Sequence, residues 1–251
     1  MSTPRPDLPP RRVRLKDGRT ARVRHGRAGD EAAIARLIAG AFPVYARAAR
    51  GDPDRAVRGL ASELEPDSYL VAELVDGDRL VGVSCVSGRA PVDRSRVERV
   101  RRKLARWGVY GLLCFVLEKL RSRLLESTPG PGPGGLYRYL DAVDPGCRSL
   151  GVGRHVADFI DDYARAAGHD SVWAKHRADN RPVLALHRKR GCVLVERQPT
   201  LLARLLRQPG MVVSTRALSA PAAALDARAA GYGRDSSLSA SLLQCTSKAS
   251  I

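Results

Sequence analysis

The stretch VDPGCRSLGVGRHV, residues 143–156, sets the pattern from which the rest of the chain is interpreted. An apolar strand ends here, the chain turns at Pro145, and a helix begins through Arg148, Gly151 and Gly153. A helix N-terminus has unsatisfied N–H groups and a partial positive charge, and it therefore binds anions. Glycines there leave room for an anion on the backbone, because they have no Cβ atom. The stretch predicts a phosphate site, with a helix cap at a tight turn as the simpler alternative.

Two widespread phosphate-binding motifs do not account for this stretch. A dinucleotide-binding GxGxxG contains three glycines and an acidic residue about 20 positions further on, and a P-loop continues as GK[ST]. Residues 148–154 read RSLGVGR, with two glycines and no GK[ST], and match neither motif. The surrounding elements must therefore identify the ligand.

The composition indicates one globular domain of ordinary size. The chain has 251 residues, of which 44% are hydrophobic, and it contains no apolar run long enough to span a bilayer. Its proline-rich, basic start lacks the apolar core of a secretory signal. Five scattered cysteines without CxxC pairs favour free thiols over disulfides, and the histidines lack metal-ligand spacing. We expect a cytoplasmic protein with no transmembrane segment and no metal.

The net charge of +17 is of the kind found in nucleic-acid-binding proteins. However, nearly all of the basic residues are Arg, and they are spread over the whole chain. This pattern fits the codon usage of a GC-rich genome at least as well as a nucleic-acid site. We do not expect nucleic acid as the partner, although a polyanionic partner stays open.

The elements alternate in a way that predicts a sandwich fold. Residues 1–18 are expected to form a flexible arm, residues 19–218 the folded domain, and residues 219–251 a disordered tail. The segment 69–88 is a predicted hairpin that turns at Asp76-Gly77-Asp78. The whole order, β-α-α-β-β-insert-β-α-β-α-β-β, predicts an α/β or α+β three-layer sandwich. The predicted strands and helices that complete this order are strands at 20–24, 136–143, 171–175, 192–197 and 211–218 and helices at 31–42, 54–64, 152–167 and 181–190.

The chain resembles the GNAT superfamily of acyl-CoA-dependent N-acyltransferases. The central motif of that family is a strand ending in V-x-P, then [QR]-x-x-G-x-[GA] at the start of a helix. Five residues match this motif in register, namely Val143, Pro145, Arg148, Gly151 and Gly153.

A second family pattern, N-x-x-A-x-x-x-Y-x-x-x-G-F, is matched in part. Asn180 and Gly191 agree with it, whereas Val183, His187 and Cys192 stand where the family has Ala, Tyr and Phe. The resemblance covers about residues 20–218 without the insert. It implies a GNAT-like three-layer sandwich, with a mixed, mostly antiparallel central sheet flanked by helices and a helical insert before the fourth strand.

The resemblance implies that the anion is the pyrophosphate of coenzyme A. Acetyl-CoA, or another acyl-CoA, is then the acyl donor, and no metal takes part. A backbone N–H near residues 141–143 would polarise the thioester carbonyl. Asn180 would contact the pantetheine arm or order a water. The cofactor-binding residues implied are Val143, Arg148, Ser149, Leu150, Gly151, Val152, Gly153, Arg154 and Asn180.

The catalytic residues implied are His187 and Asp141. In the family, a Tyr at position 187 usually protonates the leaving thiolate, and an imidazolium is a competent acid near neutral pH. Asp141 is the first choice for the general base, because it lies in the strand beside the expected thioester. Glu73 is the second choice, and a water relay is a further option. Tyr137 and Tyr139 would line the acceptor site. The alternatives are that His187 is a half-buried helix residue and Asp141 a solvated or salt-bridged carboxylate.

Residues 93–135 form a basic helical insert that ends in a Pro/Gly linker. Ten Lys and Arg against two acidic residues lie between Arg94 and Arg123, around the apolar stretch WGVYGLLCFVL. The simplest interpretation is an extra helical pair that covers the acceptor side of the site. A lid over a lipophilic acyl chain, a docking surface for an acidic acyl carrier protein and a membrane-surface helix stay open.

We therefore expect an N-acetyltransferase that acts on a primary amine of a small molecule, such as an antibiotic or a biosynthetic intermediate. The alternatives are a longer acyl-CoA or acyl-carrier-protein donor, a peptide or protein amine acceptor, and a non-catalytic module that binds coenzyme A or nucleic acid. A homodimer is also left open, since such folds often pair through sheet edges.

Overall fold

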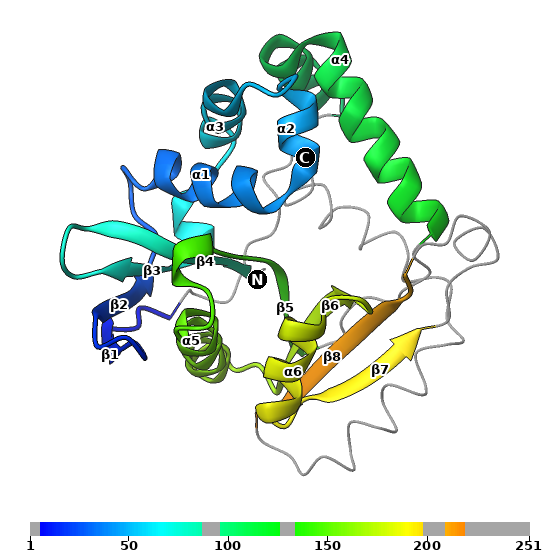
Figure 1. Cartoon of the computed structure of the whole chain (residues 1–251). Coiled ribbons are helices and arrows are strands. Elements are labelled where there is room, and N and C mark those ends of the chain that lie inside the picture. Colours follow the sequence, from blue (N-terminus) through cyan, green and yellow to red (C-terminus); the bar gives the residue numbers. More distant parts are fainter. Residues whose placement is uncertain (1–5, 87–95, 126–133, 198–208, 219–251) are drawn as a thin grey trace. The chain divides into compact units, whose positions relative to one another are not determined.

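The computed structural model describes residues 6–86, 96–125, 134–197 and 209–218 (Figure 1). The chain divides into two compact units. The first comprises Met1–Glu118 and Leu140–Ile160, and the second comprises Lys119–Tyr139 and Asp161–Ile251. The expected tail at 219–251 and most of the expected linker lie outside the described residues.

The strands of the first unit follow one another in a meander. β1 (Arg11–Arg14), β2 (Thr20–His25), β3 (Tyr69–Leu74) and β4 (Arg79–Val86) pair in this order, and each pair is antiparallel. The β3–β4 turn has positive φ at Gly77 and Asp78, as the Asp-Gly-Asp signal predicts. β5 (Gly135–Val143) ends in this unit, where the N–H of Asp144 donates to the carbonyl of Val81.

β1 differs from the sequence-based expectation, which placed it in the flexible arm 1–18. Residues 11–14 instead pair with β2, and the N–H of Lys16 donates to the carbonyl of Leu150. Leu15 is buried and anchors the segment. The strand is short and rich in Arg, which is typical of an exposed sheet edge and hides the alternation that marks a half-buried strand.

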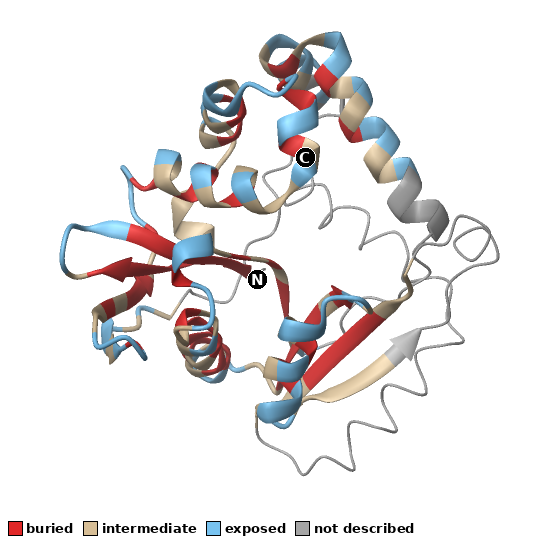
Figure 2. Ribbon diagram, viewed as in Figure 1, coloured by how far each residue is buried: buried red, intermediate tan, exposed pale blue. Residues whose placement is uncertain are grey.

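Helices cover both faces of the strands in the first unit. In Figure 1, α1 (Glu31–Ala41) lies on one side of β2–β4 and α5 (Val152–Ala166) on the other. A Cβ atom at Gly82 of β4 would lie only 2.6 Å from Cγ1 of Val152, so α5 packs tightly on β4. β3 is accordingly buried along its whole length (Figure 2). Layering of this kind confirms the predicted three-layer α/β class. The unit also contains the short helices α2 (Pro43–Ala48), η1 (Pro66–Ser68) and η2 (Pro145–Cys147).

The basic insert forms α4 (Arg96–Leu125), which is interrupted at Gly108, where φ is 69°. Two helical segments therefore stand where the sequence predicts a helical pair. Its buried aromatic residues, Trp107 and Phe115, pack against each other and against Tyr45 of α2. The indole N–H of Trp107 donates to the carboxylate of Glu63 at 2.8 Å.

Gly59→Ala in α3 (Pro53–Ala61) is expected to destabilise the protein by about 1–3 kcal/mol, because the added methyl overpacks the insert contact. A Cβ atom at Gly59 would lie 2.8 Å from two ring carbons of the buried Trp107. Gly40→Ala in α1 is the matched control, because nothing lies within 4 Å of its Cβ position. The control should gain about 0.5–1 kcal/mol from helix propensity. Urea unfolding measures both, and equal stability of the two variants would contradict the packing.

The second unit contains one parallel strand pair. β5 begins here and pairs in parallel with β6 (Ser171–Arg177), while β8 (Met211–Ala217) lies between β6 and β7 (Val193–Arg197) in antiparallel register. α6 (Arg181–Lys189) begins after its N-cap Asn180. The core includes Tyr137, Trp173 and Val213. No helix among the described residues is both long and apolar enough to cross a membrane.

Candidate active site

The loop between β5 and α5 is held at both ends by specific contacts. A carboxylate oxygen of Asp144 accepts a hydrogen bond from the N–H of Gly146, and the carbonyl of Asp144 accepts one from the N–H of Cys147. Further along, the carbonyl of Leu150 accepts from the N–H of Lys16 on the segment after β1. The conformation of the loop is therefore fixed by the first unit itself.

This loop presents backbone donors at the start of α5. Ser149 has φ of 64° and Gly151 has φ of 97°, so the chain passes twice through the left-handed region. Gly151 suits its position because a side chain is strained there. Within the part of the chain that the structure describes, no acceptor is bound to the N–H groups of residues 149–153. Runs of N–H groups at helix starts are a common form of anion-binding site in proteins.

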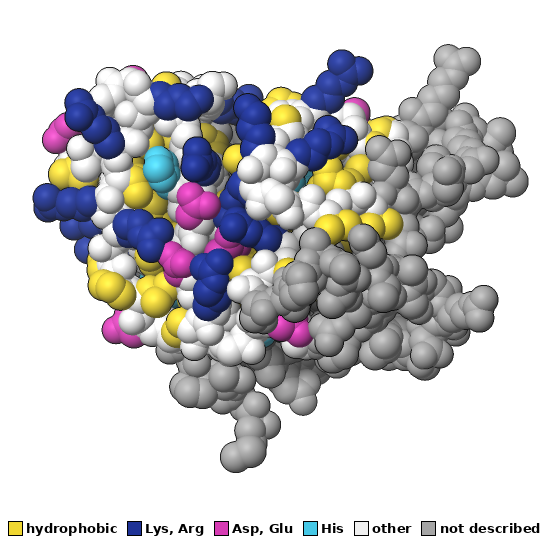
Figure 3. Space-filling view, turned by 90° about the horizontal axis from the view of Figure 1, so that it is seen from below, with side chains coloured by type: hydrophobic (Ala, Val, Ile, Leu, Met, Phe, Trp, Pro, Cys, Tyr) yellow, Lys and Arg dark blue, Asp and Glu magenta, His cyan; other side chains and the backbone are white. Residues whose placement is uncertain are grey.

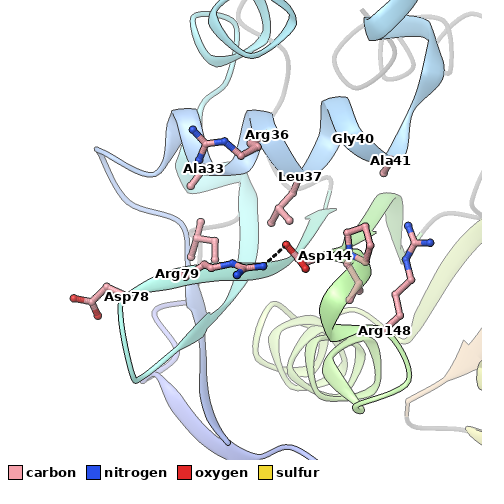
Figure 4. Close-up of a pocket in the computed structure, with 12 residues that line it drawn as sticks. Ala33, Arg36, Leu37, Gly40, Ala41, Asp78, Arg79, Asp144 and Arg148 are labelled. Carbon is pink, nitrogen blue, oxygen red and sulfur yellow. Dashed lines mark hydrogen bonds and ion pairs between the residues drawn. The ribbon is translucent and has the colours of Figure 1, made fainter. Parts of the chain in front are cut away.

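A groove of about 450 Å³ lies beside this loop in the first unit. Arg36 of α1 and Arg148 of the loop line it from opposite sides, with Arg79 and Asp144 between them (Figure 4). The remaining lining residues are small, apolar or at the β3–β4 turn, namely Ala33, Leu37, Gly40, Ala41, Asp78, Leu80, Val143 and Pro145.

Asp144 and Arg79 form an ion pair within the groove, with 2.6 Å between the guanidinium and the carboxylate. Burial alone would raise the pKa of Asp144, but the hydrogen bonds from Arg79 and from the N–H of Gly146 outweigh burial and hold that pKa below its usual value. The carboxylate is therefore ionised near neutral pH and neutralises Arg79. Arg36 and Arg148 are the cations of the groove left to attract a phosphate.

The structure brings most of the predicted cofactor-binding residues together on one short segment of the first unit. Val143 and Arg148 line the groove, and residues 149–153 supply the N–H groups. Val152 is buried against β4, so its side chain has a packing role. Arg154 is exposed and lies 3.9 Å from Asp158 of the same helix. Asp141 is half-buried on β5 in the same unit.

His187 and Asn180 belong to the second unit. His187 is only 5% exposed on α6, and its ring packs against that of His176 of β6 with centroids 4.4 Å apart. His176 in turn approaches the hydroxyl of Ser214 at 3.1 Å. Asn180 is exposed at the N-cap of α6 and makes no capping hydrogen bond with its side chain. His187 is therefore a buried helix residue, and its role as an acid stays a proposal.

Glu73, the second choice for the general base, lies in a buried ionic cluster. Its carboxylate accepts hydrogen bonds from Arg24 at 3.0 Å and from Arg22 at 2.8 Å, and it is 1% exposed. The hydrogen bond from Arg24 is the main cause that lowers its pKa to about 2, against the opposing effect of burial. A carboxylate with this pKa is a poor proton acceptor near neutral pH. The cluster holds β2 to β3 instead.

The other residues considered for the site, Tyr137, Tyr139 and Cys192, are packed against neighbouring side chains or half-buried. The ring of Tyr137 is in the second unit's core, and the ring of Tyr139 meets it edge to face with centroids 4.5 Å apart. Burial raises the pKa of Cys192, which keeps this thiol protonated. Four described cysteines are free thiols, as predicted.

Within the described residues, no group of three or more His, Cys, Asp or Glu side chains could hold a metal ion.

Arg36 and Arg79 are groove residues that sequence reasoning missed. Arg36 lies in an amphipathic helix, where an exposed Arg is ordinary, and Arg79 starts a strand after a turn. Their only signal is proximity to Arg148 and Asp144, which appears once α1, β4 and the loop are assembled.

Lysines and arginines do not gather into one patch on the face seen in Figure 3. They lie there in separate groups among acidic, hydrophobic and other residues. This distribution agrees with the even spread of Arg along the sequence.

Comparison with known proteins finds similarity to acetyltransferases. A family model described as Acetyltransferase (GNAT) family matches residues 130–192, which include the loop and α6. The structure resembles a crystal structure of an acetyltransferase with TM-score 0.52 and 15% identity, covering 78% of this chain and 99% of that one. It also resembles a GCN5-related N-acetyltransferase from Kribbella flavida with TM-score 0.50 and 18% identity, covering 79% and 98%. At these identities, the two structures support the fold. No curated protein matches the chain in a sequence comparison.

Proposed function

Because residues 130–192 match the GNAT acetyltransferase family model, we propose that the β5–α5 loop of this chain binds the pyrophosphate of acetyl-CoA for acetyl transfer to a primary amine of a small molecule. The observation that carries this assignment is the run of N–H groups at residues 149–153, next to a groove lined by Arg36 and Arg148. Backbone donors and guanidinium groups together match the charge and geometry of a diphosphate. The cytoplasmic location remains a prediction.

The roles proposed for the chain's residues are those that the resemblance to the GNAT family implies. Acetyl-CoA supplies a thioester whose carbonyl carbon is attacked by the amine. A backbone N–H at residues 141–143 polarises the carbonyl oxygen, and Asp141 accepts the proton that the attacking ammonium group must lose. His187 donates a proton to the thiolate as the C–S bond breaks, and Asn180 contacts the pantetheine arm or orders a water. No metal is needed for these steps.

The acceptor is proposed to be a small-molecule amine, such as an antibiotic or a biosynthetic intermediate. Three alternatives use the same chemistry with other partners. They are a longer acyl-CoA as donor, an acyl carrier protein as donor, and a peptide or protein amine as acceptor. A module that binds coenzyme A without turnover is the alternative of another class, and the replacement of the family Tyr by His187 permits it. Amine-dependent turnover separates the enzyme from that module.

Gly151→Val is expected to weaken coenzyme A binding at least tenfold, because a β-branched residue is strained at φ of 97° and covers the N–H groups. Arg148→Gln should weaken it about tenfold through loss of a charge-assisted bond to phosphate. Arg165→Gln, an exposed change on the helix α5 that follows the loop, is the charge-matched control and should leave the Kd unchanged. Isothermal titration with coenzyme A measures all three.

Dephospho-coenzyme A and free pantetheine refine this test. The first retains the pyrophosphate, and its Kd should show the same dependence on Arg148 and Gly151. Pantetheine lacks the pyrophosphate, and its binding should be indifferent to both changes. If both variants bind coenzyme A as tightly as the wild type, the loop is not the pyrophosphate site.

A further inference from the structure

The part of α4 that follows Gly108 and lies in the first unit, residues 109–118, is attached to that unit by one face. Phe115 is 2% exposed and packs edge to face on Trp107 and on Tyr45 of α2. A Cβ atom at Gly111 would lie 3.1 Å from the backbone carbonyl oxygen of Ala48, so this part of the helix fits closely against the end of α2. The buried face, with Gly111 and Phe115 four positions apart, fixes the helix in place.

The opposite face of this segment is apolar and exposed. Its side chains recur at the 3.6-residue period and fall within an arc of about 100° that contains no charged residue up to position 118. In the other described helices, the large apolar side chains are buried or half-buried. On this face of α4, by contrast, each of them is about half exposed or more. We name these residues the apolar face: Val109 (75%), Leu113 (51%), Val116 (53%) and Leu117 (54%).

Cationic residues flank the apolar face at both ends along the sequence. Arg96–Leu125 contains nine Lys and Arg but two acidic residues, and none of these charges falls between 107 and 117. Before the apolar face, Arg101 and Arg102 are exposed, and after it the sequence continues with Lys119, Arg121 and Arg123. Glu118 has Arg47 as its partner at 3.1 Å, which leaves little negative charge in this region.

We propose that the apolar face of α4 and its flanking cations form a docking surface for an anionic lipid membrane. An interfacial helix places its apolar side chains among the acyl chains and its Lys and Arg among anionic headgroups. Charge complementarity favours this occupant over a second copy of the chain, which would bring two sets of cations together. Because each apolar side chain is highly exposed, the apolar face is a ridge rather than a groove. The lipids of a fluid bilayer can surround such a ridge without a cavity of matching shape. The helix lies on the membrane and does not span it.

Flotation of the intact wild-type protein with lipid vesicles tests this surface. The protein should float with vesicles of phosphatidylglycerol and phosphatidylcholine and remain in solution with pure phosphatidylcholine. The triple variant Leu113→Gln, Val116→Gln, Leu117→Gln should reduce the bound fraction at least tenfold. These side chains are exposed, so the fold should persist, and an unchanged thermal unfolding curve verifies it.

A charge variant and its matched control separate headgroup attraction from general basicity. Arg101→Gln with Arg102→Gln should weaken vesicle binding about tenfold, because each cation near an anionic surface contributes to binding. Arg12→Gln with Arg14→Gln removes the same charge from the exposed strand β1 and should have little effect. Wild-type protein that ignores anionic vesicles, or a triple variant that binds them as well as wild type, would overturn the proposal. So would sedimentation showing a wild-type dimer that the triple variant converts to a monomer, since the occupant would then be a second copy.

Discussion

Replacing His187 with Phe is expected to lower kcat for acetyl transfer about a hundredfold or more, whereas His187→Tyr should retain most of the activity. Phe fills the buried position between α6 and β6 but has no proton to give to the leaving thiolate. Tyr differs from Phe by its hydroxyl group alone, and it is the residue that the related family pattern places there. Steady-state kinetics with acetyl-CoA at saturating amine compares the two variants.

The structural role of His187 must be separated from its proposed chemistry. The ring packs on His176 at 4.4 Å between centroids, so thermal unfolding of both variants is the necessary control. Equal stability with unequal kcat identifies proton delivery. If His187→Phe turns over as fast as the wild type, a water or another side chain protonates the thiolate and His187 is a packing residue.

Glu73→Ala is expected to destabilise the protein by about 3–5 kcal/mol. The change removes a buried carboxylate from the ionic cluster and takes away one of the two carboxylates that accept hydrogen bonds from buried Arg24. Arg24 is 5% exposed and donates to both Glu73 and Asp30. Asp162→Asn breaks the ion pair with Arg165 on the surface of α5 and should cost less than about 1 kcal/mol. Urea unfolding near neutral pH measures both variants. Comparable losses of unfolding free energy in the two variants would show that the buried cluster stabilises the protein no more than a surface ion pair does.

The same cluster predicts the acid response of the protein. The pKa of Glu73 is about 2 in the folded chain against an ordinary value of 4.5. This stabilisation is fully present above about pH 4.5 and is lost as the pH falls toward 2, since the unfolded chain takes up the proton first. It amounts to about 3 kcal/mol. In Glu73→Ala, the unfolding free energy should accordingly fall less steeply between these pH values than in the wild type.

Sequence patterns predicted most of the fold because the elements were locally consistent. The Asp-Gly-Asp turn and the helix opened by Gly151 lie where their local chemistry indicates, and α6 begins directly after Asn180, as the sequence predicts. Local patterns could not identify β1, because an Arg-rich edge strand has no apolar alternation. Nor could they place β8 between β6 and β7, since strand order depends on pairing over long separations.

The candidate site also has one part that local sequence predicts and another that only the folded structure brings together. The loop and helix start at residues 144–153 form a contiguous motif, so the positive φ values follow from adjacent residues. The same holds for the N–H groups of residues 149–153, which have no acceptor within the described residues. Arg36 and Arg79 enter the groove from α1 and β4, and no spacing in the sequence joins them to Arg148. Glu73 shows the opposite case. Its strand position suggested a general base, and only the folded structure reveals the two arginines that donate hydrogen bonds to it.

Amine-dependent release of free thiol from acetyl-CoA is the measurement that tests the central claim most directly. Wild-type protein should release coenzyme A only when a suitable primary amine from a panel is present, and mass spectrometry should find the acetyl group on that amine. Gly151→Val at the same acetyl-CoA concentration should be strongly impaired. Tight binding of coenzyme A by the wild type without thiol release from acetyl-CoA or longer acyl-CoAs, whatever the amine, would contradict acetyl transfer and leave a binding module in its place.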